Sequence, residues 1–207
     1  MMEKLVVDLS VRLAREYKVD GFRFDLMGFH SRGTMVKVRN ALASLTLTND
    51  GVDGSAIYVY GEGWNFGDIG DDRRFIQATQ ANVAGTGIGS FNDRLRDSVR
   101  GGGPFDAGLA HVNNQGYISG QWYDPNAQND GDDGERQRLL GATDLIRLAM
   151  AGQLASYELE DNMGTVMRGD EFNYAGQLAG YTEDPQEIIN YIASHDGETL
   201  WDISAFK

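Results

Sequence analysis

The chain has 207 residues, of which 41% are hydrophobic and 24% are charged, a composition usual for a globular domain with its own core. Its formal net charge of −13 argues against nucleic acid and anionic membranes as partners, because both would repel it. The chain has no cysteine, which excludes disulfides and thiolate metal sites, and no apolar run reaches the roughly 18 residues of a membrane-spanning helix.

The first part of the chain predicts helices alternating with strands. A helix is expected over residues 3–17, where leucines recur at helical spacing (Leu5, Leu9, Leu13). The stretch 19–25 reads as a strand. A second helix follows at about 33–45, with Thr34 as its candidate cap, and a second strand lies in AIYVYGEG. This order with short connections is the repeating unit of a parallel α/β sheet.

The rest of the chain is less regular. After Trp64 it is rich in glycine and reads as irregular through GTGIGSFNDRLRDSVRGGGPFD, with a weak third strand at Ile88–Phe91. We predict a long polar loop over 116–136, a helix over 137–154 and a last strand over 187–194. Loops of this length within a compact domain are usually functional.

Three predicted strands end in carboxylates, and this pattern indicates a catalytic site. Asp25 ends the first, Glu62 the second and Asp196 the last. The carboxyl ends of parallel strands share one face of a sheet or barrel, where active sites lie. Acids that converge there repel one another, but a retaining glycosidase needs two of them about 5 Å apart.

Neighbouring residues fit the same chemistry, and most also have a structural reading. Arg23 and Asp25 lie on one face of their strand. They would form either a buried salt bridge or a catalytic nucleophile with its orienting arginine. Glu62 lies between glycines beside Trp64, where partial burial and two nearby acids would suit a general acid. His195 fits hydrogen bonding to sugar hydroxyls or a local pair with Asp196. The aromatic residues suit sugar stacking or core packing (Phe29, Trp64, Trp201).

Four stretches of the chain resemble the debranching branch of the α-amylase superfamily of glycoside hydrolases, the pullulanases and limit dextrinases. They are VDGFRFDLMG, GEGWNFG, SFNDRLRDSVRGG and DPQEIINYIASHDGETL, and the resemblance covers essentially the whole chain. It implies Asp25 as the nucleophile, Glu62 as the general acid/base and Asp196 as the third acid. Arg23 and His195 would be their partners.

The resemblance also implies a fold and an activity. The fold is α/β, part of a (β/α)8 TIM barrel, with residues 1–207 as the central part of one catalytic domain. The chain would supply roughly strands four to seven, with a loop-rich segment between strands six and seven. The family cleaves α-1,6 branch links in pullulan, amylopectin and limit dextrins, with retention. The expected partner is therefore an α-glucan.

The sequence departs from that family in two ways. Gly197 follows His195 and Asp196 where debranching enzymes usually have Asn, so weaker sugar binding near the −1/+1 subsites is expected. The family's first signature, a strand ending in Asp and Asn-His, is absent, as are the first three strands and the eighth. The chain begins within a helix and stops without a tail, so we expect an excerpt of a catalytic domain that is inactive alone. The alternatives are a non-catalytic carbohydrate-binding remnant, an α-1,4 hydrolase or an isoamylase-type enzyme.

The sequence offers little for metals, cofactors or location. The acidic stretch NDGDDGE lacks the ligand spacing of an EF-hand, and the three histidines lack metal-ligand spacing. GTGIGS has the wrong spacing for a dinucleotide site. No cofactor is expected for the chemistry, although relatives carry structural calcium elsewhere. An acidic chain without cysteine suits an exported or cell-surface bacterial enzyme, but composition leaves the compartment open.

Overall fold

The computed structural model describes all residues, 1–207, and divides into two compact units. Unit 1 comprises Met1–Phe91 and Thr182–Ile189. Unit 2 comprises Asn92–Tyr181 and Asn190–Lys207. The chain therefore passes from unit 1 to unit 2 twice.

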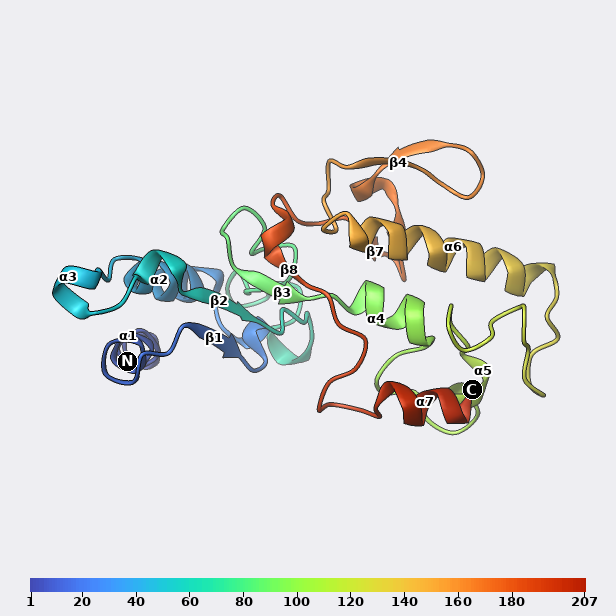
Figure 1. Ribbon diagram of the computed structural model, residues 1–207, viewed down its shortest axis with the longest axis horizontal. Coiled ribbons are helices and arrows are strands. Elements are labelled where there is room, and N and C mark those ends of the chain that lie inside the picture. Colours follow the sequence, from blue (N-terminus) through green and yellow to red (C-terminus); the bar gives the residue numbers. More distant parts are fainter. The chain divides into compact units, whose positions relative to one another are not determined.

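Unit 1 is built on a parallel sheet of four strands (Figure 1). In spatial order these are β1 (Gly21–Phe24), β2 (Tyr58–Gly61), β3 (Gly89–Phe91) and β8 (Ile188–Ile189). Its helices are α1 (Met2–Tyr17), α2 (Arg32–Ala43) and the short α3 (Leu47–Asp50). The predicted α/β class and parallel sheet are confirmed. The sheet has two edges within this chain, β1 and β8.

One face of this sheet is covered by α1 and α2, which pack against each other. Paired residues of parallel strands point to the same face, and Phe22, Phe24 and Val59 point toward the helices. They join a buried cluster to which α2 contributes most (Met35, Val38, Leu42). The residues that alternate with them along each strand point to the opposite face of the sheet.

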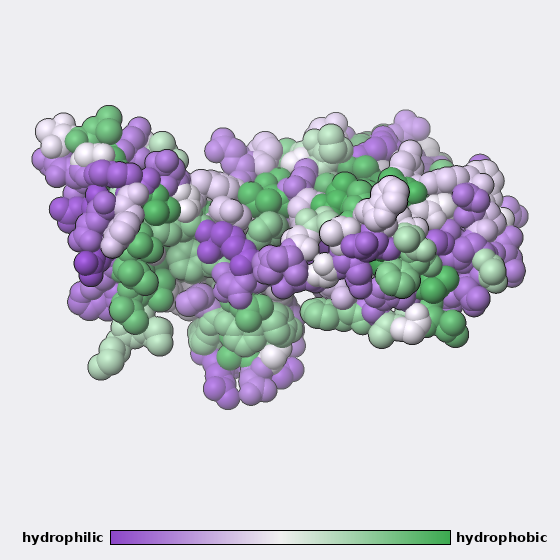
Figure 2. Space-filling model, turned by 60° about the horizontal axis from the view of Figure 1, so that its bottom comes forward, coloured by the Kyte–Doolittle hydropathy of each residue, from purple (hydrophilic) through white to green (hydrophobic).

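The leucines that recur at helical spacing in α1 do not form its main buried face. Leu5 and Leu9 are 59% and 49% exposed, whereas Val7, Val11 and Ala14 pack on the core. The helix carries two apolar stripes, and helical periodicity alone does not say which of them meets the sheet. Hydrophobic residues accordingly reach the surface in several patches (Figure 2).

The cap of α2 also differs from the prediction. Its N-cap is Ser31, whose Oγ accepts a hydrogen bond from the Thr34 backbone N–H at 3.1 Å. Thr34 is instead the third residue inside the helix, and its hydroxyl donates to the Glu3 carboxylate at 3.1 Å. Serine and threonine are both good N-caps, so the sequence alone does not decide which of the two caps the helix.

Unit 2 is mainly helical, with two small hairpins (Figure 1). Its helices are α4 (Asp93–Arg100), α5 (Leu109–Asn113), α6 (Asp133–Met150) and α7 (Leu200–Phe206). The hairpins are formed by β4 (Glu158–Glu160) with β5 (Val166–Arg168), and by β6 (Asn173–Tyr174) with β7 (Gln177–Leu178). Leu95 and Val99 of α4 pack against Ala149 of α6, and α5 lies beside α7.

Three sequence-based predictions for the chain after β3 need correction. Helix α4 occupies a stretch predicted as irregular, because its flanking glycines and many charges hide the Leu95–Val99 spacing. Helix α6 begins at Asp133, four residues earlier than predicted, since the Asp132 carboxylate caps it by accepting from the Glu135 N–H at 2.8 Å. The last parallel strand ends at Ile189, so Asp196 does not lie at its end.

None of the helices is both long enough and apolar enough to cross a membrane.

Candidate active site

The face of the sheet away from the helices carries polar and aromatic side chains. The register pairs Arg23 with Tyr60, and Tyr60 with Gly89, which places Phe91 on the same face. The Arg23 guanidinium lies over the Phe91 ring, with its Cζ 5.6 Å from the ring centroid. Tyr60 meets the same ring edge to face at 5.7 Å. This cation–π contact holds the arginine side chain against the sheet.

Arg23 binds both of the carboxylates that follow the first two strands. Its Nη1 donates to Asp25 Oδ1, and its Nη2 lies 3.0 Å from Glu62 Oε1. The two acids differ in environment, since the Asp25 side chain is 66% exposed and the Glu62 side chain only 8%. Hydrogen bonds between ionised groups are stronger than those between neutral groups. The Arg23 guanidinium can therefore position both the exposed Asp25 carboxylate and the enclosed Glu62 carboxylate.

Glu62 also fixes the loop that follows β1. Its Oε2 accepts a hydrogen bond from the Leu26 N–H at 2.7 Å, and its carbonyl accepts from the Gly28 N–H at 2.9 Å. Leu26 adopts a left-handed backbone conformation, with φ 45°, which is uncommon for a residue with a branched side chain. Such strain persists only where surrounding contacts impose it, and it clusters at functional sites.

The loops after β1 and β2 approach so closely that Gly28 admits no side chain. A Cβ added to it would lie 2.1 Å from the carbonyl oxygen of Trp64. Gln77, which is fully buried, donates from Nε2 to the Gly28 carbonyl at 2.9 Å. The Leu-Met-Gly and Gly-Glu-Gly-Trp sequences thus form one interlocked pair of loops. The sequence did not single out Gln77, because a glutamine side chain comes to bridge two loops only through contacts formed in the folded protein.

Two aromatic rings lie side by side on these loops. Phe29 and Phe66 meet edge to face at 4.9 Å, and both are about two-fifths exposed. Phe29 was predicted as a sugar-contacting residue, and the sequence did not single out its neighbour Phe66. Trp64 is half-buried. Exposed ring faces are suited to packing against the apolar faces of sugar rings.

The remaining predicted residues belong to unit 2. His195 Nε2 lies 3.3 Å from Asp196 Oδ1, and both side chains are exposed. They are on the segment that follows β8, not at the strand end as predicted. Gly197 has room for a side chain, because an added Cβ would lie 3.8 Å from its nearest contact, Arg100 Nη1. Trp201 is an exposed residue of α7. Arg23, Asp25 and Glu62 are thus the predicted residues that contact one another within unit 1.

No group of three or more histidine and acidic side chains is placed to hold a metal ion. The acidic loop before α6 instead supplies the caps and first turn of that helix.

No protein-family model matches the sequence. Among individual proteins, it is 44% identical to the chloroplastic pullulanase 1 of Arabidopsis thaliana, over 100% of this chain and 21% of that protein. It is also 44% identical to the pullulanase of Klebsiella aerogenes, over 100% of this chain and 18% of that protein.

A solved structure agrees with these sequence matches. The crystal structure of PulA from Klebsiella pneumoniae in complex with maltotriose superposes with a TM-score of 0.89 at 43% identity. The superposition covers 100% of this chain and 21% of the PulA chain. The chain is therefore a homologue of the pullulanases, and it spans about one fifth of the length of the relatives that it matches.

Proposed function

We propose that this chain carries the nucleophile and the acid/base of a retaining glycoside hydrolase that cleaves α-1,6-glucosidic branch links. The observation that carries the proposal is that Arg23 binds both Asp25 and Glu62, directly after two neighbouring parallel strands. A retaining glycosidase needs two carboxyl groups with different tasks, one as the nucleophile and the other as the acid/base. The substrates would be pullulan, amylopectin or limit dextrins.

The two environments suit the two tasks. Asp25 is open to solvent and would attack the anomeric carbon, forming the glycosyl–enzyme bond as the leaving oxygen departs. Glu62 is enclosed and held by Arg23 and the Leu26 N–H; it would protonate that oxygen and then take a proton from the attacking water.

The other predicted residues would contact the sugar. Asp196 would act as the third acid, and His195 would hydrogen-bond sugar hydroxyls beside it. Phe29 and Trp64 would stack on sugar rings.

The relatives support the choice of substrate. The matched proteins are named pullulanases, and one was crystallised with maltotriose, an α-glucan oligosaccharide. We infer that residues 1–207 form the central part of a (β/α)8 barrel, with β1, β2, β3 and β8 as its strands four to seven. The rest of the barrel would come from sequence outside this chain.

A chimera tests the assignment of Glu62. The 207 residues would replace the matched fifth of the Klebsiella aerogenes pullulanase, with which they align over their whole length. In this chimera Glu62→Gln keeps the shape of the side chain but cannot transfer a proton. It should lower kcat on pullulan at least about a thousandfold while binding of pullulan survives. The matched control is Glu158→Gln, because Glu158 is exposed on β4.

The products and the size of the loss separate the alternatives. Maltotriose released from pullulan marks α-1,6 cleavage, whereas an α-1,4 hydrolase would release other oligosaccharides. An Asp25→Asn chimera that still turns over would contradict a nucleophilic Asp25. A chimera that binds pullulan but never cleaves it would favour the non-catalytic binding remnant.

A further inference from the structure

Unit 2 contains a cavity of about 680 Å³ that includes none of the predicted site residues. It is lined by α4 and the glycines after it, by the end of α5 and the loop that follows, by α6 and by β6. Its backbone lining includes Gly101 and Gly116, which touch so closely that a Cβ on Gly116 would lie 2.2 Å from the Gly101 nitrogen. The volume is in the range of small-molecule sites.

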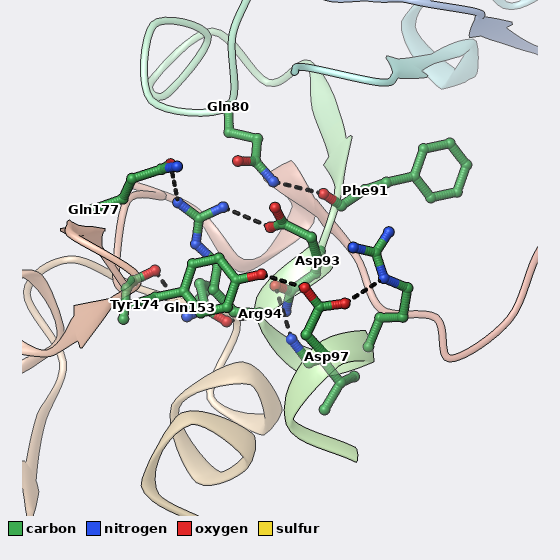
Figure 3. A network of polar contacts seen from close by, with 12 residues as sticks. Gln80, Phe91, Asp93, Arg94, Asp97, Gln153, Tyr174 and Gln177 are labelled. Carbon is green, nitrogen blue, oxygen red and sulfur yellow. Dashed lines mark hydrogen bonds and ion pairs between the residues drawn. The ribbon is translucent and has the colours of Figure 1, made fainter. Parts of the chain in front are cut away.

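The lining is polar without being strongly charged. Its amide side chains are Asn113, Asn114, Gln115, Gln121, Asn129 and Asn173. The Glu135 carboxylate is paired with Arg138. The Asp97 carboxylate lies 2.6 Å from Arg96 Nε and accepts a hydrogen bond from the Tyr174 hydroxyl, as Figure 3 shows for Asp97 and Tyr174. Because these charges are already compensated, an ionic ligand would gain little here.

Amides and hydroxyl groups form complementary pairs. An amide side chain carries both donors and an acceptor, and each sugar hydroxyl is likewise both donor and acceptor, although the Asn129 donors and the Gln115 acceptor are already used within the protein. Ala142 and Leu145 of α6 add an aliphatic wall to the same cavity. A neutral molecule with many hydroxyl groups and apolar ring faces matches this combination.

Gln121 points to the ligand more directly. It lines the cavity and is 8% exposed, yet its side-chain amide has no hydrogen-bond partner in the protein. Its backbone is held in place by a hydrogen bond from its N–H to the Gly116 carbonyl at 3.3 Å. By contrast, the neighbouring Gln115 amide donates to backbone carbonyls and accepts from Asn129. Because this amide is not sealed from solvent, it is accessible from the cavity and free to bind a molecule there.

We propose that this cavity is a binding site for a short α-glucan segment, with the Gln121 amide as its central hydrogen-bonding group. The preference for a neutral polyhydroxylated ligand follows from the lining alone, whereas the choice of α-glucan rests on the proposed function. The site would hold substrate without taking part in bond cleavage.

Maltotriose titrated into the ¹⁵N-labelled 207-residue chain tests this directly. The side-chain amide resonances of Gln121, assigned by their absence in Gln121→Leu, should shift saturably. Gln121→Leu should weaken maltotriose binding at the cavity about tenfold, measured from shifts of neighbouring backbone amides. Gln137→Leu is the matched control, because Gln137 is exposed on α6 and does not line the cavity.

A second variant keeps the test independent of folding defects. A Cβ on Gly141 would meet nothing within 4 Å, so Gly141→Leu extends into the open cavity without a clash and favours the helix. It should abolish the Gln121 shift while leaving the rest of the spectrum folded. A saturating titration without a Gln121 shift would overturn the proposal. Equal shifts with glycerol would overturn its assignment to α-glucan.

The two proposals fail separately. An active chimera whose Gln121 amide ignores maltotriose contradicts only the cavity site. A chimera without turnover whose Gln121 resonances still shift contradicts only the assigned catalysis.

Discussion

Arg23 shows how one side chain organises the candidate site. It contacts Asp25, Glu62 and the Phe91 ring from within β1. Strand alternation was enough to predict that Arg23 and Asp25 share a face. The bond from Arg23 to Glu62 could not be predicted, because it depends on the register between β1 and β2, which the sequence does not specify.

Replacing Arg23 should destabilise unit 1 by leaving the Glu62 carboxylate enclosed without its cation. Arg23→Leu should cost about 3 kcal/mol of unfolding free energy, measured by urea denaturation of the 207-residue chain. In a Glu62→Gln background, where only the exposed Asp25 carboxylate loses its cation, the same change should cost at least about 1 kcal/mol less. Equal costs in both backgrounds would show that the ion pair does not support the fold.

His30 predicts a pH dependence of stability. Burial lowers the pKa of His30 below its ordinary value of 6.5, and its ring packs edge to face on Phe24 at 6.0 Å. The unfolded chain therefore binds this proton more readily, so its contribution to stability is lost as pH falls below about 6.5. His30→Phe should reduce the fall in the free energy of unfolding between pH 7.5 and 5.5, by less than about 1.4 kcal/mol per pH unit, as measured by urea denaturation. Unchanged slopes would contradict this.

Among the helices and strands, the sequence-based predictions are confirmed where residues close together in the chain determine the element. The first three parallel strands lie within the predicted stretches, because β-branched and aromatic residues bounded by glycines mark them. Prediction failed for α4, and the leucine spacing did not indicate which face of α1 is buried. In both cases the outcome depends on which neighbour covers the helix. The hairpins of unit 2 were missed as well, since their strands of two or three residues are too short to show alternation.

The interlocked loops after β1 and β2 predict opposite effects at two nearby glycines. Gly28→Ala forces a methyl group against the Trp64 carbonyl and should cost about 2 kcal/mol or more. Gly33→Ala lies in α2, where the nearest atom is 3.9 Å from the added Cβ, and should stabilise by about 0.5–1 kcal/mol. Urea midpoints of the two variants measure both, and a tolerated Gly28→Ala would show that the loops can separate.

At the scale of the whole molecule, this chain matches only about one fifth of its relatives. Its sheet has unpaired edges at β1 and β8, whereas a closed barrel has none. The barrel membership, the strand numbering and the role of Asp196 therefore remain predictions.

We expect the 207-residue chain to be inactive by itself. Incubated with pullulan, it should release no reducing sugar above the level of its Glu62→Gln variant, because part of the substrate site would be missing. The chimera with Klebsiella aerogenes pullulanase should release maltotriose under the same conditions. Turnover by the isolated chain, abolished by Glu62→Gln, would refute this expectation.

The position of β8 in the chain has a consequence for biosynthesis. β8 pairs with β3, yet residues 92–187 must leave the ribosome between them. Until then β3 presents an open edge while unit 2 is folding. Exposed strand edges of nascent chains are prone to intermolecular pairing. Substitutions that slow the folding of unit 2 should therefore increase aggregation during synthesis, even where they touch no residue of the sheet.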